Sequence, residues 1–238
     1  MKILAIGNSF SQDATKYLQT VAKSTGEELF VRNIYIGGCS LERHALNIKT
    51  GEVAYAYEED AQKIGEISIG DALTREKWDF VTVQQVSGKS GKIETYEPFM
   101  GELMTFIKEK APQATVVFHR TWQYEKGSHH GDFPSYGCDR DRMYECIVEA
   151  TGEAARRYGL EIIGSGDAIH RAVELLEFDP EQGGVSMYRD GFHLGLTYGR
   201  YLAALVWFEF FTGRSAKDVT FAPEGTAPKL IEILKELA

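Results

Sequence analysis

Several features that mark common protein classes are missing from this sequence. It has no run of about 18 apolar residues, so it contains no candidate membrane-spanning helix. Its three cysteines, Cys39, Cys138 and Cys146, form no CxxC pair and leave an odd count. They therefore do not suggest a disulfide framework. Acidic residues outnumber basic ones, for a net charge of −9. This balance argues against nucleic acid or an anionic membrane as the main partner.

Signals for export or for division into domains are also absent. An apolar strand pattern already begins at residue 2, which leaves no room for a signal peptide. We therefore expect a cytoplasmic protein, or a secreted or periplasmic one from which a leader was removed. No repeat, low-complexity tract or linker interrupts the 238 residues. A single domain over residues 1–238 is the expectation.

Short apolar segments alternate with helical patterns along the chain. This alternation predicts right-handed crossovers and a parallel sheet. We expect a three-layer α/β/α sandwich, flavodoxin-like, with about five parallel strands. Residues 42–70 read as an irregular connection, which either walls a substrate cleft or extends into solvent. The predicted strands cover residues 3–6, 28–36, 78–85, 114–119 and 161–163. The predicted helices cover 13–23, 96–111, 139–158, 168–178 and about 197–213.

The first strand leads directly into Gly7-Asn8-Ser9, and a helical pattern follows. A serine in such a turn projects at the carboxyl edge of the sheet, where α/β folds bind ligands. Its hydroxyl is then exposed, and its backbone N–H lies close to a helix start, where it can stabilise an anion. These are the requirements of a serine nucleophile. The alternative is a structural turn in which a serine, such as Ser11, or Asp13 only caps the helix.

Near the other end of the chain, Asp190 and His193 stand three residues apart before a strongly apolar helix. In a turn, this spacing brings the carboxylate against one imidazole nitrogen and leaves the other free. The acid then fixes the tautomer, and the imidazole acts as a general base. The alternative is a purely structural turn in which Asp190 caps the backbone and His193 satisfies the carboxylate.

Two other chemistries are weaker. The tripeptide Gly-Lys-Ser at residues 88–90 suggests a phosphate-binding loop, but the glycine required five positions earlier is Val83. His129, His130 and Cys138 lie in one loop, yet no second pair of ligands has the spacing of a zinc site. We expect a solvated loop there, and neither a metal nor an organic cofactor.

Taken together, these segments resemble the SGNH (GDSL-type) hydrolases over about residues 3–210. Gly7-Asn8-Ser9 is similar to the first block of that family, with Asn8 where aspartate is commoner. Gly38, after the second strand, matches the glycine block, and the stretch 190–193 matches the last block. The sequence is closest to an uncharacterised bacterial branch with a Gln-Gln element at 84–85 and a Thr-Trp element at 121–122.

The resemblance implies a serine esterase in which Ser9, His193 and Asp190 form the catalytic triad. It also implies an oxyanion hole made by the N–H groups of Ser9 and Gly38. The family's third donor is an asparagine that this chain lacks. Gln85 is the expected replacement because its amide offers the same N–H chemistry, while Gln84 and Ser87 stay open as alternatives.

The substrate is expected to be a small acylated molecule, with the acetyl or another short acyl group on a carbohydrate. Trp122 and Tyr124 are candidates for an aromatic platform under a sugar, and Asn8 is a further candidate substrate contact; a buried Trp122 that fills the core is the opposing interpretation. Two other functions stay open. One is a carbohydrate-binding protein that kept the fold but lost turnover. The other is a phosphate- or nucleotide-binding domain.

Overall fold

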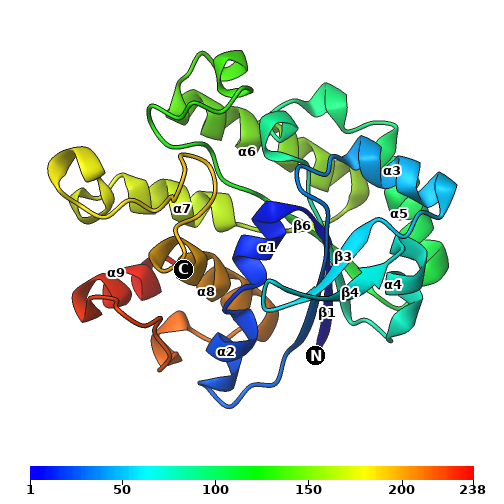
Figure 1. Ribbon diagram of the computed structural model, residues 1–238, viewed down its shortest axis with the longest axis horizontal. Helices are drawn as coiled ribbons and strands as arrows, with labels where there is room; N and C mark the ends of the chain where they lie inside the picture. The colour runs from blue at the N-terminus through cyan, green and yellow to red at the C-terminus, as the bar shows by residue number, and fades with distance from the viewer.

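The computed structural model describes all residues 1–238 and contains one seven-stranded sheet in the order β4-β3-β2-β1-β5-β6-β7. β1 pairs in parallel with β2 and β5, and the parallel arrangement continues to β7. The amino terminus lies at the lower end of β1 in Figure 1, so the carboxyl ends of the parallel strands point upward. The strands are β1 (Lys2–Gly7), β2 (Phe30–Tyr35), β3 (Tyr55–Glu59), β4 (Gln62–Ile67), β5 (Phe80–Val83), β6 (Thr115–His119) and β7 (Glu161–Ile163).

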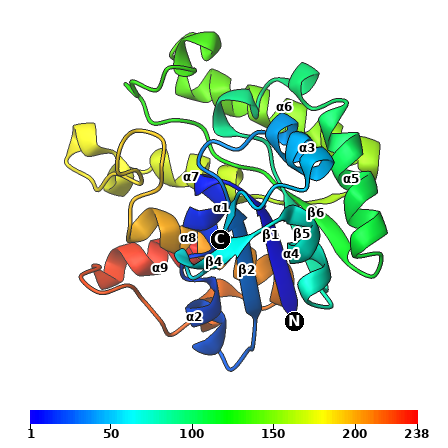
Figure 2. The same ribbon diagram turned by 45° about the vertical axis from the view of Figure 1, so that its right-hand side comes forward.

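Helices cover both faces of the sheet, and each face has its own hydrophobic core. Successive residues of β1 alternate between these cores: Ile3 and Ala5 belong to one, Leu4 and Ile6 to the other. Burial on both faces explains why the parallel strands are nearly continuous apolar runs. Figures 1 and 2 agree in placing α8 and α9 on one side of the sheet and α4 and α5 on the other.

The first core lies under α1 (Ser9–Thr15), α2 (Leu18–Lys23), α7 (Ser165–Val173), α8 (Tyr198–Thr212) and α9 (Pro228–Leu237). α8 is apolar almost all round because it contacts α1, α2, α7 and α9 as well as the sheet. The second core lies under α3 (Leu41–Thr50), α4 (Ile69–Arg75) and α5 (Phe99–Lys110), and α6 (Arg140–Tyr158) contributes residues to both cores.

The predicted sandwich and its five parallel strands are confirmed, but the expectation for residues 42–70 is wrong. This segment forms α3, the antiparallel hairpin β3–β4 and the start of α4. The hairpin extends the parallel sheet beyond β2. Its turn, Asp60-Ala61, has positive φ at both residues, 49° and 59°. Such turns usually carry Asn-Gly or Asp-Gly, so Asp-Ala concealed the hairpin in the sequence.

The first helical pattern also differs from its prediction. One helix was expected over residues 13–23, but the chain forms α1 and α2 with a break at Lys16 and Tyr17. α1 begins at Ser9, so the candidate nucleophile is the first residue of the helix. None of the helices combines the length and apolar composition needed to cross a bilayer.

Candidate active site

The turn between β1 and α1 is built by Gly7 and Asn8. A Cβ atom on Gly7 would lie 2.4 Å from Ser11 Oγ, so the close packing of this turn requires glycine. Asn8 is the N-cap of α1, and its Oδ1 accepts a hydrogen bond from the Phe10 N–H at 3.0 Å. Neither Ser11 nor Asp13 caps the helix; both lie inside it. Ser9 is left at the helix start, with a backbone N–H that has no intrahelical acceptor.

The structure brings Ser9, His193 and Asp190 into one hydrogen-bonded row. His193 Nε2 lies 2.8 Å from Ser9 Oγ, and His193 Nδ1 lies 2.7 Å from Asp190 Oδ2. Asp190 Oδ1 also accepts the backbone N–H of His193 at 2.8 Å. Because the carboxylate can only accept, Nδ1 carries the imidazole proton and Nε2 is free to accept the serine proton.

The charge of Asp190 is maintained by its own loop. Partial burial disfavours ionisation, but hydrogen bonds from the His193 ring and from the backbone N–H groups of Phe192 and His193 outweigh it. The pKa of Asp190 is therefore lowered from its ordinary value of 3.8. The carboxylate stays ionised across the neutral range, where it can hold the imidazole in one orientation.

Asp13 connects the two halves of the site. Its side chain is fully buried, and Oδ2 accepts the backbone N–H of Leu194, next to His193, at 3.0 Å. The Arg189 and Arg200 guanidinium groups donate to the same carboxylate at 2.9 and 2.7 Å. Asp13 lies one helical turn after Ser9, so a single short helix carries the nucleophile and the anchor of the histidine loop. The spacing of four residues between Ser9 and Asp13 was the sequence signal for this role, although the sequence suggested Asp13 only as a helix cap.

The predicted second oxyanion group, Gly38, lies in the turn after β2 with a φ of +63°. No group of the protein accepts a hydrogen bond from its N–H. Asn8 ties this turn to the nucleophile, because its Nδ2 donates to the Cys39 carbonyl at 3.0 Å. Ser9 and Gly38 therefore line one pocket with a fixed separation.

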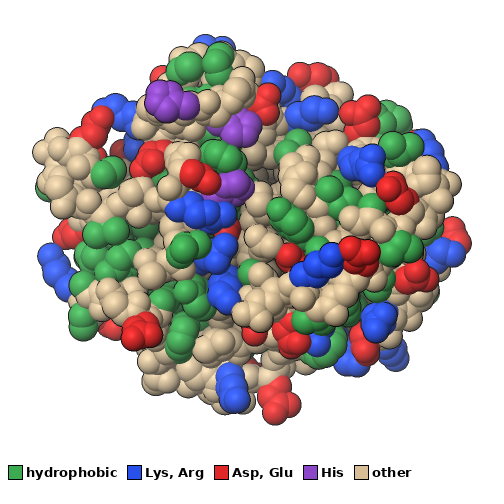
Figure 3. All heavy atoms as spheres, viewed as in Figure 1, with side chains coloured by type: hydrophobic (Ala, Val, Ile, Leu, Met, Phe, Trp, Pro, Cys, Tyr) green, Lys and Arg blue, Asp and Glu red, His purple; other side chains and the backbone are tan.

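This pocket has a volume of about 440 Å³, and most of the residues that line it are polar residues or glycine. Figure 3 shows histidine side chains gathered beside a hollow on this face, with Lys and Arg side chains below them. The pocket is lined by Asn8, Ser9, Tyr35, Gly37, Gly38, Ser40, Val86, Ser87, Lys89, His130, Asp132, Phe192 and His193.

Gln85 does not contribute to this pocket, which contradicts its predicted role as an oxyanion donor. Its side chain is buried, and Oε1 accepts the N–H groups of Leu41 at 3.0 Å and Val86 at 2.9 Å. Nε2 donates to the carbonyl and hydroxyl of Thr95. Gln85 thus joins the start of α3 to the loop after β5, and both of its amide atoms are occupied.

Gln84 is occupied as well, on the other face of the sheet. Its Nε2 donates to Asn8 Oδ1 at 2.9 Å, and its Oε1 lies 2.8 Å from His119 Nδ1. His119 Nε2 contacts Ser165 Oγ at 3.0 Å. Burial lowers the pKa of His119 from 6.5 to about 3, so this imidazole is neutral. A buried hydrogen-bonded row that runs from Ser165 to Asn8 therefore fixes the turn that carries Ser9.

The residues predicted to contact substrate act differently. Trp122 is fully buried, stacks on Phe10 with ring centroids 4.3 Å apart, and donates its indole N–H to the Phe192 carbonyl. Tyr124 is also fully buried, with its hydroxyl 3.0 Å from Ser87 Oγ. Neither ring has a free face, so the predicted sugar platform is wrong. Asn8 borders the pocket, but its amide is used by the turns, so its role is positioning.

His130 was placed in a solvated loop, yet it lines the pocket. Its ring packs against Tyr124 and Phe192, with centroids 4.5 and 4.6 Å away. Nδ1 accepts the Asp132 N–H at 3.2 Å, which leaves the proton of the neutral ring on Nε2. His129 stays exposed. Nowhere do three or more His, Cys, Asp or Glu side chains form a group able to hold a metal.

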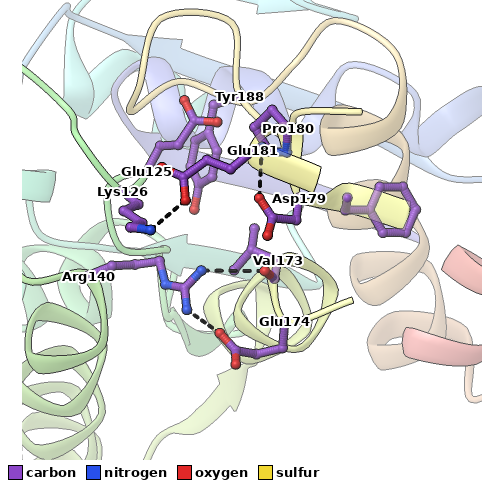
Figure 4. Close-up of a pocket in the computed structure, with 10 residues that line it drawn as sticks. Glu125, Lys126, Arg140, Val173, Glu174, Asp179, Pro180, Glu181 and Tyr188 are labelled. Carbon is purple, nitrogen blue, oxygen red and sulfur yellow. Dashed lines mark hydrogen bonds and ion pairs between the residues drawn. The ribbon is translucent and has the colours of Figure 1, made fainter. Parts of the chain in front are cut away.

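A second pocket, of about 240 Å³, adjoins the loop that carries Asp190, and Figure 4 shows the residues that line it. Two ion pairs border it, Lys126 with Glu181 and Arg140 with Glu174. Glu125 borders this pocket and donates its backbone N–H to the Gly191 carbonyl at 2.8 Å. The pocket holds no nucleophile, and its wall supports the Asp190 loop.

The chain matches the profile of the domain of unknown function DUF4886 over residues 2–238. A DUF4886 family protein from Bacteroides uniformis ATCC 8492 shares 39% sequence identity with it. The crystal structure of that protein has a TM-score of 0.90, with 100% of this chain and 92% of that chain covered. No curated protein has a sequence that matches this chain significantly.

More distant solved structures share the fold. A candidate SGNH hydrolase from Slackia heliotrinireducens has a TM-score of 0.59 at 26% identity, covering 89% of this chain and 98% of that chain. A candidate GDSL-like lipase from Parabacteroides merdae ATCC 43184 has a TM-score of 0.58 at 15% identity, covering 87% and 94%. The fold expected from the sequence, that of the SGNH hydrolases, is confirmed.

Proposed function

This chain belongs to the DUF4886 family, and we propose that it is a serine hydrolase that cleaves carboxylic esters. The row Ser9–His193–Asp190, with contacts of 2.8 and 2.7 Å, is the observation that carries the proposal. Nucleophile, base and orienting acid are all within hydrogen-bond reach, and the nucleophile faces a pocket. The likeness of the fold to SGNH hydrolases supports the same class.

Acylation begins when Ser9 Oγ attacks the ester carbonyl carbon and His193 Nε2 takes the hydroxyl proton. The carbonyl π electrons move to the oxygen, which becomes the oxyanion of a tetrahedral intermediate. When the intermediate collapses, the bond to the alcohol oxygen breaks, and His193 returns its proton to that oxygen. The products of this step are the free alcohol and an acyl ester on Ser9.

Deacylation repeats these steps with water as the nucleophile. His193 Nε2 takes a proton from the water as its oxygen attacks the acyl carbon, and a second oxyanion forms. Collapse breaks the bond to Ser9 Oγ, and His193 returns the proton to the serine. Asp190 stabilises the imidazolium in both halves of the cycle. The N–H groups of Ser9 and Gly38, which have no acceptor in the protein, stabilise both oxyanions.

The lining of the pocket supports a polar substrate with a short acyl group. Hydroxyl groups of Tyr35 and Ser40 and the charged ends of Lys89 and Asp132 border it. A long acyl chain would need a continuous apolar channel beside Ser9, and the lining does not provide one. We propose acetyl or a similar short acyl group on a carbohydrate as the substrate class.

The test is hydrolysis of p-nitrophenyl acetate and butyrate by the wild type and by Ser9→Ala, with Ser215→Ala as control for an exposed serine outside the pocket. We expect turnover in the wild type and Ser215→Ala, a preference for acetate, and none in Ser9→Ala. A fluorophosphonate should label Ser9. Equal rates in wild type and Ser9→Ala, with no labelling, would contradict the proposal and favour a binding protein. Release of acetate from acetylated glycans then tests the substrate class.

A further inference from the structure

The oxyanion hole has two backbone donors, Ser9 and Gly38, and its third donor has to come from another element. We expect it in the loop after β5, because this loop begins at Gln84, which contacts Asn8 in the nucleophile's turn. Both glutamines at the start of the loop are buried outside the pocket, and their amides are bonded to protein groups. Ser87 follows them and lines the same pocket as Ser9, Gly38 and His193. Its hydroxyl is the remaining side-chain donor of the three alternatives.

The direction of the Ser87 proton follows from its neighbour. Ser87 Oγ and Tyr124 Oη lie 3.0 Å apart, and either could be the donor. Tyr124 is fully buried and its hydroxyl has no other partner. Burial raises the pKa of Tyr124, so the phenol keeps its proton at working pH. A buried hydroxyl proton without an acceptor is costly, so the phenol donates to Ser87 Oγ.

This donation leaves the Ser87 proton without an acceptor inside the protein. The hydroxyl can therefore point its proton into the pocket while it accepts the proton of Tyr124. Two hydroxyls in series polarise each other, which makes the second one a stronger donor. The row then runs from Tyr124 to Ser87 to a ligand oxygen.

The backbone around Ser87 is held in place before any substrate binds. Its carbonyl accepts the Ser90 hydroxyl at 2.7 Å, and the preceding N–H of Val86 is held by Gln85. Asp132 packs against Gly88 so closely that a Cβ there would lie 1.9 Å from Asp132 Oδ2. A donor fixed in advance stabilises a developing charge without reorganisation, which is the property of an oxyanion hole.

We propose that Ser87 is a catalytic residue whose hydroxyl donates the third hydrogen bond to the oxyanion, and that Tyr124 positions and polarises it. The inference rests on the proposed esterase function. It assigns to a hydroxyl pair the task that an asparagine amide performs in the family that this sequence resembles. In each half-reaction the Ser87 hydroxyl keeps its proton, so no additional proton has to be balanced.

The test compares steady-state hydrolysis of p-nitrophenyl acetate by Ser87→Ala, Tyr124→Phe and the double variant. For Ser87→Ala we expect kcat and kcat/KM to fall together by roughly 10²–10³, because the lost bond forms only in the transition state. Tyr124→Phe should lower kcat about tenfold, because it removes one neutral hydrogen bond to Ser87. The double variant should be no slower than Ser87→Ala, because Tyr124 acts only through Ser87. Ser215→Ala, an exposed serine outside both the loop and the pocket, is the control.

The test remains decisive even if the single variant Ser87→Ala fails to fold. Ser87→Ala leaves a buried phenol without a partner, whereas the double variant removes both hydroxyls and restores an apolar contact. If only the double variant folds, its kcat must still fall by roughly 10²–10³. A kcat within about threefold of the wild type in Ser87→Ala or the double variant would overturn the inference and leave the esterase intact. Absence of Ser9-dependent turnover in the wild type would overturn both proposals.

Discussion

The nucleophile's turn and the loop of the catalytic histidine are held in opposite ways. Asn8 is buried, and both polar atoms of its amide bond protein groups, on Cys39, Phe10 and Gln84. The side chain of Asp190 is 41% exposed, and its hydrogen-bond partners are the neighbouring Phe192 and His193. One half of the site is part of the core of the sheet, and the other is a surface turn.

This difference predicts which substitutions should lower the stability of the fold and which should lower only the catalytic rate. A change in the nucleophile's turn disturbs buried contacts between strands, so it should affect folding as much as catalysis. A change in the histidine loop removes exposed contacts, so it should affect catalysis alone. Asp13 is the exception, because it is buried in α1 and holds the histidine loop through Leu194.

Asp190→Asn should give the largest effect and tests the surface half of the comparison. The amide no longer fixes the imidazole tautomer or stabilises its positive charge, so we expect kcat to fall by about 10³–10⁴. Tm should change little, because the replaced side chain is exposed. Esterase assays and thermal unfolding measure the two quantities. The control is Asp218→Asn, an exposed carboxylate near Arg214. A drop in Tm as large as that of a core variant would show that the histidine loop contributes to stability as much as the buried turn does.

Asp13→Asn tests the link between the halves. It removes the charge that compensates the guanidinium groups of Arg189 and Arg200. Breaking a buried ion pair typically costs 3–5 kcal/mol, and since both arginines are partly exposed we expect about 3 kcal/mol of unfolding free energy. Activity below Tm should also fall as His193 loses its anchor. Urea unfolding measures the loss. Glu76→Gln, which breaks the surface pair with Lys2, should cost much less unfolding free energy than Asp13→Asn. Equal losses would argue against the anchor.

The same contrast explains what the sequence could predict. The five parallel strands were predictable because each is a local apolar run that burial on both faces requires. Ser9 and the pair Asp190 and His193 were predictable because their geometry depends on a strand end and a short turn. The roles of the glutamines were not, because Gln85 contacts Leu41, 44 residues away, and Gln84 contacts His119, 35 residues away.

The positions of the aromatic residues and of one turn were also not predictable from local sequence. Trp122 follows a strand at the ligand edge, and nothing local indicates that Phe10 covers its face. His130 belongs to a loop rich in polar residues, and only the tertiary fold brings it beside Phe192 in the pocket. The β3–β4 hairpin was not predicted because its turn, at Asp60 and Ala61, adopts positive φ without a glycine.

The smallest predicted effect is the share of His119 in the pH dependence of stability, and it tests the buried half of the site. Burial lowers the pKa of His119 and His44 from 6.5 to about 3, so both stay neutral in the fold while the unfolded chain takes up protons. Their stabilising contribution is complete above about pH 6.5 and declines as the pH falls toward 3, by about 1.4 kcal/mol per pH unit for each. Urea unfolding between pH 7.5 and about 5 should show this decline. His119→Gln keeps a donor for Gln84 and an acceptor for Ser165, so it should show a shallower slope. The exposed His129→Gln should keep the slope of the wild type, and an equally steep slope in His119→Gln would mean that His119 is not held neutral beneath the nucleophile.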